Sequence, residues 1–182
     1  MNSVYLKDLA LKTIEDCTFI KNVTYFGKEA KLQLLLPSGD EKYVSFWVRD
    51  CAMMSESGLI PNDLLKKYVE IIALNGVNMK GTVLLKNGLE IPPYAVADHI
   101  NYDGKPVYFP GTYDSGSNQG NGDFGYFPPF CDNYYYIMMI GWYIKQSGDN
   151  AILQKEYNGQ SLSFITEKIF EGYNIDEETG LA

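Results

Sequence analysis

The sequence predicts a chain built mainly of α-helices, arranged in part as a helical hairpin. Three observations lead to this prediction. Residues 61–76 carry apolar side chains at helical spacing, with a proline at the start and a glycine at the end. Residues 132–147 are apolar almost throughout, which is typical of a helix buried on nearly every side. The turn "SGDN" then leads into another helical pattern, so the last two helices are expected to form a hairpin with one inner and one outer member.

The first half of the chain combines helices with a short extended region. Residues 3–20 repeat apolar side chains with a period near 3.6, which predicts a helix. Residues 22–48 are expected to be extended, with "PSGDE" as the turn between two strand-like runs. The segment "CAMMSESG" predicts a short helix that ends at Gly58. A stronger helix is predicted from Pro61 to Gly76, two residue types that suit these positions.

The second half of the chain begins with a long loop at residues 77–131. This loop is rich in glycine and proline but also in aromatic residues, so we expect ordered irregular structure. Asp132 is expected to cap the apolar helix, and Gly148 to end it. Asp149 is then expected to cap a final, more polar helix that is interrupted near Gly159.

Composition and charge narrow the function. The 182 residues fit one domain and carry a net charge of −8, without a cluster of Lys and Arg. The prediction is therefore that the protein binds neither nucleic acid nor an anionic membrane surface. No segment approaches the length of a membrane span, and the N-terminus lacks the pattern of a signal peptide. We expect a soluble cytoplasmic chain, although a chain whose leader had been removed would look the same.

The cysteine and histidine residues show no recognisable metal-binding pattern in the sequence. Cys17, Cys51 and Cys131 lie far apart and show no metal-ligand spacing, so free thiols are expected. With His99 as the single histidine, a three-histidine or HExxH site is impossible. The glycine-rich run "DSGSNQGNGD" lacks the ligands of an EF-hand loop. We therefore expect no metal and no cofactor.

The segment "FWVRD" is the first candidate site, because Arg49 and Asp50 stand in an otherwise apolar run. One interpretation is structural: an ion pair, with Asp50 as the cap of the following helix. The other is a fork of donors and acceptors for the neighbouring hydroxyls of a sugar, with Trp47 and other aromatic rings as a stacking face. The 15 tyrosines are compatible with sugar binding, and equally with a core that uses tyrosine.

The pair Asp98 and His99 is the second candidate site. The structural interpretation is a loop histidine that forms hydrogen bonds with its neighbours. The functional interpretation is a residue that contacts a ligand hydroxyl. The sequence alone leaves both open.

Several segments resemble a known family. "SFWVRDCAMM", "IPPYAVADHI", "FPGTY", "FGYFPPFCDNYYYI" and "YIKQSGDNAILQ" occur in this order. Together they resemble the N-terminal half of the catalytic domain of six-hairpin glycosidases, the glycoside hydrolases that include glucoamylase and glycogen-debranching enzymes. The resemblance implies an all-α fold, a partial (α/α)6 toroid of helical hairpins, with the extended segment at 22–48 and the ordered loop at 77–131 as departures. Residues 1–182 would be one domain, the N-terminal portion of a larger one.

The resemblance also implies where a sugar would bind. Arg49 and Asp50 would hold the non-reducing sugar of an oligosaccharide or glycoside, with Trp47 beside them. The helix that begins at Asp132 would point at the same place, which puts Asp132 and Tyr135 near the sugar.

The same resemblance implies an incomplete catalytic pair. An inverting glycosidase needs one carboxylic acid and one carboxylate. Glu177 and Glu178 are weak candidates for the acid, and no residue of this chain suits the base. We therefore expect that the isolated chain does not hydrolyse glycosides.

Two other functions remain open from the sequence. The protein could be a non-catalytic carbohydrate-binding protein, or a helical protein that self-associates through an uncovered inner helix. The apolar helix at 132–147 needs more partners than about five helices supply, so we expect either a missing C-terminal half or a homo-oligomer.

Overall fold

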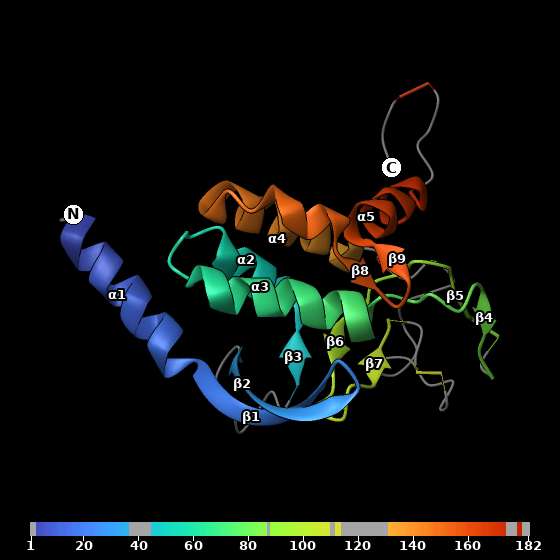
Figure 1. The fold of residues 1–182 in the computed structure, drawn as a ribbon, viewed down its shortest axis with the longest axis horizontal. Coiled ribbons are helices and arrows are strands. Elements are labelled where there is room, and N and C mark those ends of the chain that lie inside the picture. The colour runs from blue at the N-terminus through green and yellow to red at the C-terminus, as the bar shows by residue number, and fades with distance from the viewer. Residues whose placement is uncertain are drawn as a thin grey trace.

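A long β-hairpin and a layer of helices lie on opposite sides of helix α3 in the computed structural model (Figure 1). The structure describes residues 3–36, 45–86, 88–109, 112–113, 131–173 and 178–179. The helices are α1 (Ser3–Asp16), α2 (Val48–Ser55), α3 (Asn62–Ile71), α4 (Cys131–Ser147) and α5 (Leu162–Glu171), with a π-helical turn at Ile72–Gly76 and a 3-10 helix at Asn150–Gln154. The strands are β1 (Thr18–Tyr25), β2 (Lys28–Leu35), β3 (Phe46–Trp47), β4 (Val83–Leu84), β5 (Glu90–Ile91), β6 (His99–Ile100), β7 (Pro106–Val107), β8 (Glu156–Tyr157) and β9 (Gln160–Ser161).

The strands form small antiparallel sheets, so the expected all-α fold is wrong. Within the described ranges, β1 pairs with β2, β3 with β6 and β6 with β7, β4 with β5, and β8 with β9. The chain is therefore a mixture of helices and antiparallel sheets. Its helices do not alternate as the inner and outer members of a partial (α/α)6 toroid.

The hairpin β1–β2 explains much of this difference. Its turn is Phe26–Gly27, and both residues have positive φ angles, 49° and 69°. Two consecutive positive φ angles give a turn whose twist matches that of the flanking strands. The extended region thus begins at Thr18, and the helix predicted over 3–20 ends at Asp16. The segment "PSGDE" lies outside the described residues.

The second difference lies after α4, where the sequence predicts one interrupted helix. The structure has a 3-10 helix, the hairpin β8–β9, and only then α5. The hairpin turns at Asn158–Gly159, again with two positive φ angles, 53° and 83°. Ser161 then caps α5 by accepting a hydrogen bond from the backbone N–H of Phe164 at 3.3 Å. The expected α-helical hairpin is therefore absent from this part of the chain.

Two expected helix caps are also wrong. Helix α2 begins at Val48, after Trp47 as its N-cap, so Asp50 lies in the first turn. Helix α4 begins at Cys131, so Asp132 is its second residue. An aspartate in a first helical turn still faces the positive end of the helix dipole.

Helix α3 is the centre of the packing, and α4 lies along it (Figure 1). The hydroxyl of Tyr136 donates a hydrogen bond to the carbonyl of Val69 at 2.9 Å. The buried positions of α4 recur every three or four residues, which gives the helix one buried face. Because Tyr134 is 56% exposed, the expectation that this helix is buried on nearly every side is wrong.

The described part of the loop at 77–131 is ordered around a buried amide. The side-chain N–H groups of Asn78 donate to the carbonyls of Gly81 and Pro92, both at 2.8 Å. Its Oδ1 accepts a hydrogen bond from the hydroxyl of Tyr113 at 3.0 Å. One buried side chain thus holds three separate stretches of the loop together, which explains its order without long strands.

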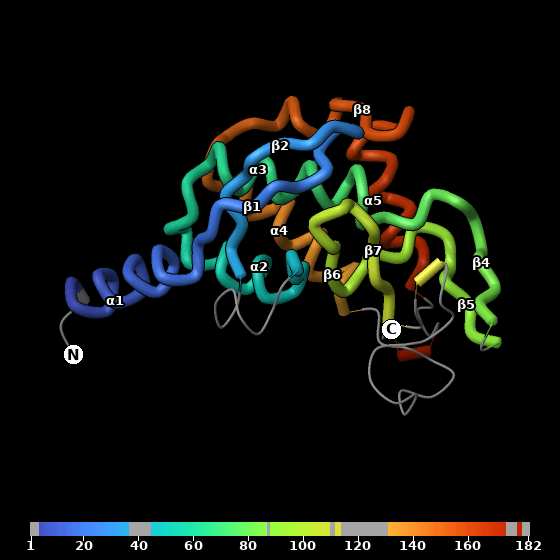
Figure 2. The backbone as a smooth tube through the Cα atoms, turned by 90° about the horizontal axis from the view of Figure 1, so that it is seen from below, coloured from blue at the N-terminus to red at the C-terminus, as the bar shows by residue number. Residues whose placement is uncertain are grey.

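Helix α1 extends away from the rest of the chain in both views (Figures 1 and 2). Several of its large apolar side chains are exposed, including Val4, Tyr5 and Leu9. Among the helices that the structure describes, none has the length and apolar character needed to cross a membrane.

Candidate functional site

The pairing of β3 with β6 brings the two sequence motifs together. Trp47 lies opposite His99 in this antiparallel pair. Their rings are 4.3 Å apart between centroids, with an angle of 33° between the ring planes. Beside them, the backbone N–H of Val48 donates to the carbonyl of Asp98 at 3.0 Å. The start of α2, with Arg49 and Asp50, is therefore fixed next to the Asp98–His99 pair.

The beginning of α4 reaches the same place through a buried hydrogen bond. Oδ1 of Asn133 accepts from the backbone N–H of Val96 at 2.7 Å. This bond ties the first turn of α4 to the chain two residues before Asp98. On the other side of the same turn, Nη1 of Arg49 lies 4.0 Å from Sγ of Cys131. Helices α2 and α4 also pack against each other.

Arg49 faces several acidic groups at this point. Desolvation lowers the pKa of Arg49, but the charges of Cys131, Asp132, Asp50 and Asp98 outweigh it, and the pKa is raised above its usual value. One guanidinium group therefore interacts with three aspartates from three different segments. It is the shared positive charge of the site.

Asp132 is the most perturbed acid of the site. Its side chain is buried, with 2% relative exposure, and its Oδ1 has no hydrogen-bond partner among the described residues. Burial, and then the charge of Asp98, raise the pKa of Asp132 to about 7, although Arg49 acts in the opposite direction. An acid with this pKa exchanges its proton near neutral pH.

Asp98 and His99 interact directly. Nδ1 of His99 lies 2.9 Å from Oδ2 of Asp98, and both side chains are mostly buried. This hydrogen bond is the one that the structural interpretation expects. Because Trp47 stacks on the same imidazole, the pair also fixes the position of an aromatic ring next to the charged groups.

Six of the predicted substrate-binding residues lie in this cluster, which we call the Arg49 cluster: Trp47, Arg49, Asp50, Asp98, His99 and Asp132. Tyr135 lies about one turn further along α4, half-buried, with its ring 5.8 Å from that of Tyr134. Glu178 is exposed in a turn, and Glu177 lies outside the described residues, as does the run "DSGSNQGNGD".

Three neighbours of the cluster were not predicted from the sequence: Cys131, Asn133 and Tyr173. Burial raises the pKa of Tyr173 to about 12, a hydrogen bond from the backbone of Tyr134 opposes this, and the charges of Cys131 and Asp132 add to it. The end of α5 thus reaches the beginning of α4. Cys131 and Asn133 flank Asp132 in sequence, and this adjacency could have indicated that they lie near the cluster. Tyr173 had none.

The arrangement offers donors, acceptors and an aromatic surface within a small region. Arg49 supplies N–H donors, and the aspartates supply acceptors. Hydroxyl groups of a ligand both donate and accept, so such a mixed set suits a polyhydroxylated molecule. Within the described ranges, no group of three or more His, Cys, Asp and Glu side chains is arranged to hold a metal ion.

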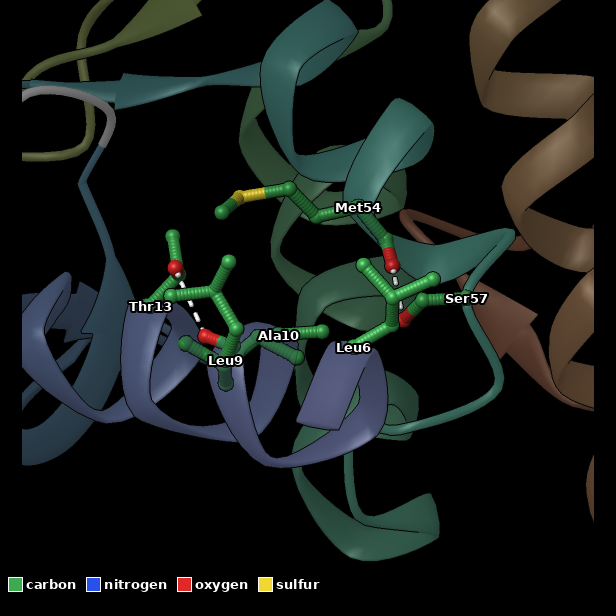
Figure 3. A pocket seen from close by; sticks show the side chains of 7 residues that line it. Leu6, Leu9, Ala10, Thr13, Met54 and Ser57 are labelled. Atoms are coloured by element: carbon green, nitrogen blue, oxygen red, sulfur yellow. Dashed lines mark hydrogen bonds between the residues drawn. The ribbon is translucent and has the colours of Figure 1, made fainter. Parts of the chain in front are cut away.

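An apolar groove between α1 and the end of α2 is a concave surface separate from the Arg49 cluster (Figure 3). It has a volume of about 320 Å³ and is lined by Leu6, Leu9, Ala10, Thr13, Ile14, Met54 and Ser57. Its two hydroxyl groups are used internally, since Thr13 donates to the carbonyl of Leu9 at 2.9 Å and Ser57 to that of Met54 at 2.7 Å. The groove therefore offers a contact area for an apolar ligand, but few groups that could orient a polar ligand.

Comparison with known proteins gives no relative. No family model matches the chain, and no curated protein or solved structure matches it either. Together with the mixed fold, this overturns the resemblance to six-hairpin glycosidases. The segments that carried the resemblance are short and separated along the chain.

Proposed function

We propose that the Arg49 cluster binds a sugar unit of an oligosaccharide or glycoside. In this proposal Arg49 and Asp50 bind neighbouring hydroxyl groups of the sugar. The paired rings of Trp47 and His99 supply an apolar wall for its C–H face. The function is thus carbohydrate binding in the manner of a glycoside hydrolase, without membership of the six-hairpin family.

The observation that carries the proposal is the convergence of the cluster. Arg49 and Cys131 are 82 positions apart in sequence, yet Nη1 and Sγ are 4.0 Å apart. A structural ion pair would need one acid, whereas three aspartates act on Arg49 here. Arg49 is exposed, so its donors remain accessible to a ligand.

A binding experiment tests this proposal. Arg49→Ala and Asp50→Asn are compared with the wild type by isothermal titration calorimetry, using methyl glycosides and maltooligosaccharides as probes. We expect at least tenfold weaker binding in each variant, which corresponds to about 1.4 kcal/mol. Asp103→Asn is the matched control, since this aspartate is exposed in a turn. Equal binding by all four proteins would refute the proposal.

We expect binding without turnover by the isolated chain. The cluster holds three carboxyl groups, but no acid and base on opposite sides of a glycosidic bond are assigned. Incubation with nitrophenyl glycosides tests this expectation. Release of nitrophenol by the wild type that is lost in Arg49→Ala would show that the protein is an enzyme.

Self-association is the second candidate function, and the groove of α1 favours it. The groove side of this helix is apolar, and Val4, Tyr5 and Leu11 are exposed elsewhere on the helix. We propose a second copy of the chain as the occupant. Size-exclusion chromatography with light scattering tests this: a dimer that Leu9→Glu converts to a monomer supports it, and a wild-type monomer at high concentration excludes it.

The cysteines favour a reducing compartment as the location of the protein. Cys17, Cys51 and Cys131 are all free thiols in the structure. Free thiols are typical of proteins of the cytoplasm. We therefore propose a cytoplasmic location, which cell fractionation with an antibody or a tag would test.

A further inference from the structure

Asp132 is a deeply buried acid of the Arg49 cluster, and among the described residues one of its two oxygens has no hydrogen-bond partner. It is the second residue of the 17-residue helix α4 and is 2% exposed. Oδ1 has no partner among the described residues. A buried carboxylate oxygen without a partner is costly, so the group either keeps its proton or receives a partner from a ligand.

The charges that face Asp132 come from every element around it. Helix α2 contributes Arg49 and Asp50, and Asp98 precedes β6, with its Oδ2 next to His99. Helix α4, which carries Asp132, also contributes the thiol of Cys131. The phenol of Tyr173, which follows α5, faces the same group. One guanidinium thus faces three carboxyl groups, and ionising all three would leave the cluster with excess negative charge.

These groups favour the neutral form of Asp132. Desolvation and Asp98 raise the pKa of Asp132 to about 7, and Arg49 with the amino end of α4 does not cancel this. A neutral carboxyl group has one O–H donor besides its acceptor capacity, whereas a carboxylate only accepts. The protonation of Asp132 therefore changes what the cluster offers to a ligand.

We propose that Asp132 is a specificity-determining residue of the cluster, and that in its neutral form it donates a hydrogen bond to a hydroxyl group of an uncharged sugar. This inference rests on the proposed sugar-binding function and names its substrate class. A sugar acid would add a negative charge next to Asp50 and Asp98, so it is disfavoured. Binding of a neutral sugar raises the proton affinity of Asp132 and is therefore accompanied by proton uptake near neutral pH.

The binding arm of the test compares pH values, sugars and variants. Methyl glucosides and glucuronate are titrated into the wild type, Asp132→Asn and Asp103→Asn. If only the neutral form of Asp132 binds, the affinity for methyl glucoside falls about tenfold from about pH 6 to about pH 8. Glucuronate binds at least tenfold more weakly than the glucoside. Asn has an amide donor and no charge, so Asp132→Asn is expected to bind the glucoside equally well at both pH values, while Asp103→Asn keeps the pH dependence of the wild type.

A second arm needs no sugar and separates the two proposals. Carbon-13 NMR of the aspartate carboxyl groups follows their titration in the ligand-free protein, and the spectrum of Asp132→Asn identifies the signal of Asp132. We expect this signal to titrate near pH 7. Titration near pH 4 would overturn the inference even if sugars bind. No binding of any sugar at any pH would overturn the proposed function, and this inference with it, whatever the titration shows.

Discussion

Two buried carboxyl groups, Glu70 in α3 and Asp132 in α4, have opposite surroundings. Glu70 accepts hydrogen bonds from the hydroxyl of Tyr25 and the ammonium of Lys155, and a further one from the hydroxyl of Tyr157 at 3.2 Å. Asp132 has an oxygen without a partner among the described residues and faces two other aspartates. Two acids that are equally buried therefore differ in how far their hydrogen-bonding capacity is used within the described residues.

Under the proposed function, the contrast separates a structural acid, Glu70, from a ligand-binding one, Asp132. Glu70 connects the hairpin β1–β2 with α3 and with β8 through the hydroxyl groups of Tyr25 and Tyr157. Its satisfied oxygens leave nothing for a ligand. Asp132 lies where α2, β6 and α4 meet, and its Oδ1, which has no partner within the described ranges, can still accept or donate a hydrogen bond. Such incompletely satisfied groups are typical of binding and catalytic sites.

Removing Glu70 is expected to have the largest effect on stability. Glu70→Ala leaves Lys155 and two tyrosine hydroxyls without their common partner. We expect the free energy of unfolding to fall by about 3 kcal/mol, because breaking a buried charged network is costly. Urea unfolding followed by tryptophan fluorescence measures this. Glu167→Ala, an exposed position in α5, is the control. An equal loss of stability in Glu70→Ala and Glu167→Ala would contradict the structural role given to Glu70.

The effect of Asp132→Asn on stability is expected to depend on pH. The pKa of Asp132 is raised from 3.8 to about 7 on folding, so between these values the folded chain binds more protons than the unfolded one. Stability therefore falls as pH rises through this window, and it is highest below it. Asparagine does not ionise. We expect Asp132→Asn to raise the free energy of unfolding at about pH 8 and to change it little at about pH 4. Unfolding curves of both proteins at both pH values test this. A variant that is less stable than the wild type at the higher pH would contradict the expectation.

Asn133 is expected to have a smaller effect that combines stability and site geometry. Asn133→Ala leaves the buried N–H of Val96 without its 2.7 Å partner. The expected loss is about 1.5 kcal/mol, the usual cost of an unsatisfied buried donor. Sugar binding should weaken too, since this bond sets the position of Asp132. Asn150→Ala is the exposed control, and unfolding and calorimetry report the two effects separately.

Arg49 is expected to matter least for stability. Its side chain is exposed, and exposed charged residues change stability by about 0.5 kcal/mol or less on substitution. Arg49→Ala should therefore melt close to the wild type while it loses sugar binding. A large drop in melting temperature would instead make Arg49 a structural residue.

The sequence predicts some elements well because their signals are local. The helix over 61–76 appears as α3 and the π-helical turn after it, since its apolar spacing and its flanking Pro61 and Gly76 act within a few residues. The hairpin β8–β9 was predictable but missed. Asn158–Gly159 is the dipeptide most typical of a tight hairpin turn, and a helical interpretation of its flanks outweighed it.

The convergence of the cluster is not a local property. Arg49 meets Cys131 because α2 packs on α4, and Asp98 meets Asp132 because Asn133 binds the backbone of Val96. The sequence motifs indicate which residue types suit a sugar, but the contacts that bring them together depend on the whole fold. For the same reason, only the structure shows that Oδ1 of Asp132 lacks a partner in the part of the chain that it describes.

The most direct test of the central claim is a two-dimensional amide NMR titration of the protein with a neutral methyl glycoside. The account predicts that the shifted signals belong to the Arg49 cluster and its neighbours, above all the amides of Trp47, His99, Cys131 and Asp132 and the indole N–H of Trp47. Shifts confined to the groove of α1, around Leu9 and Met54, or no shifts at saturating sugar, would contradict it.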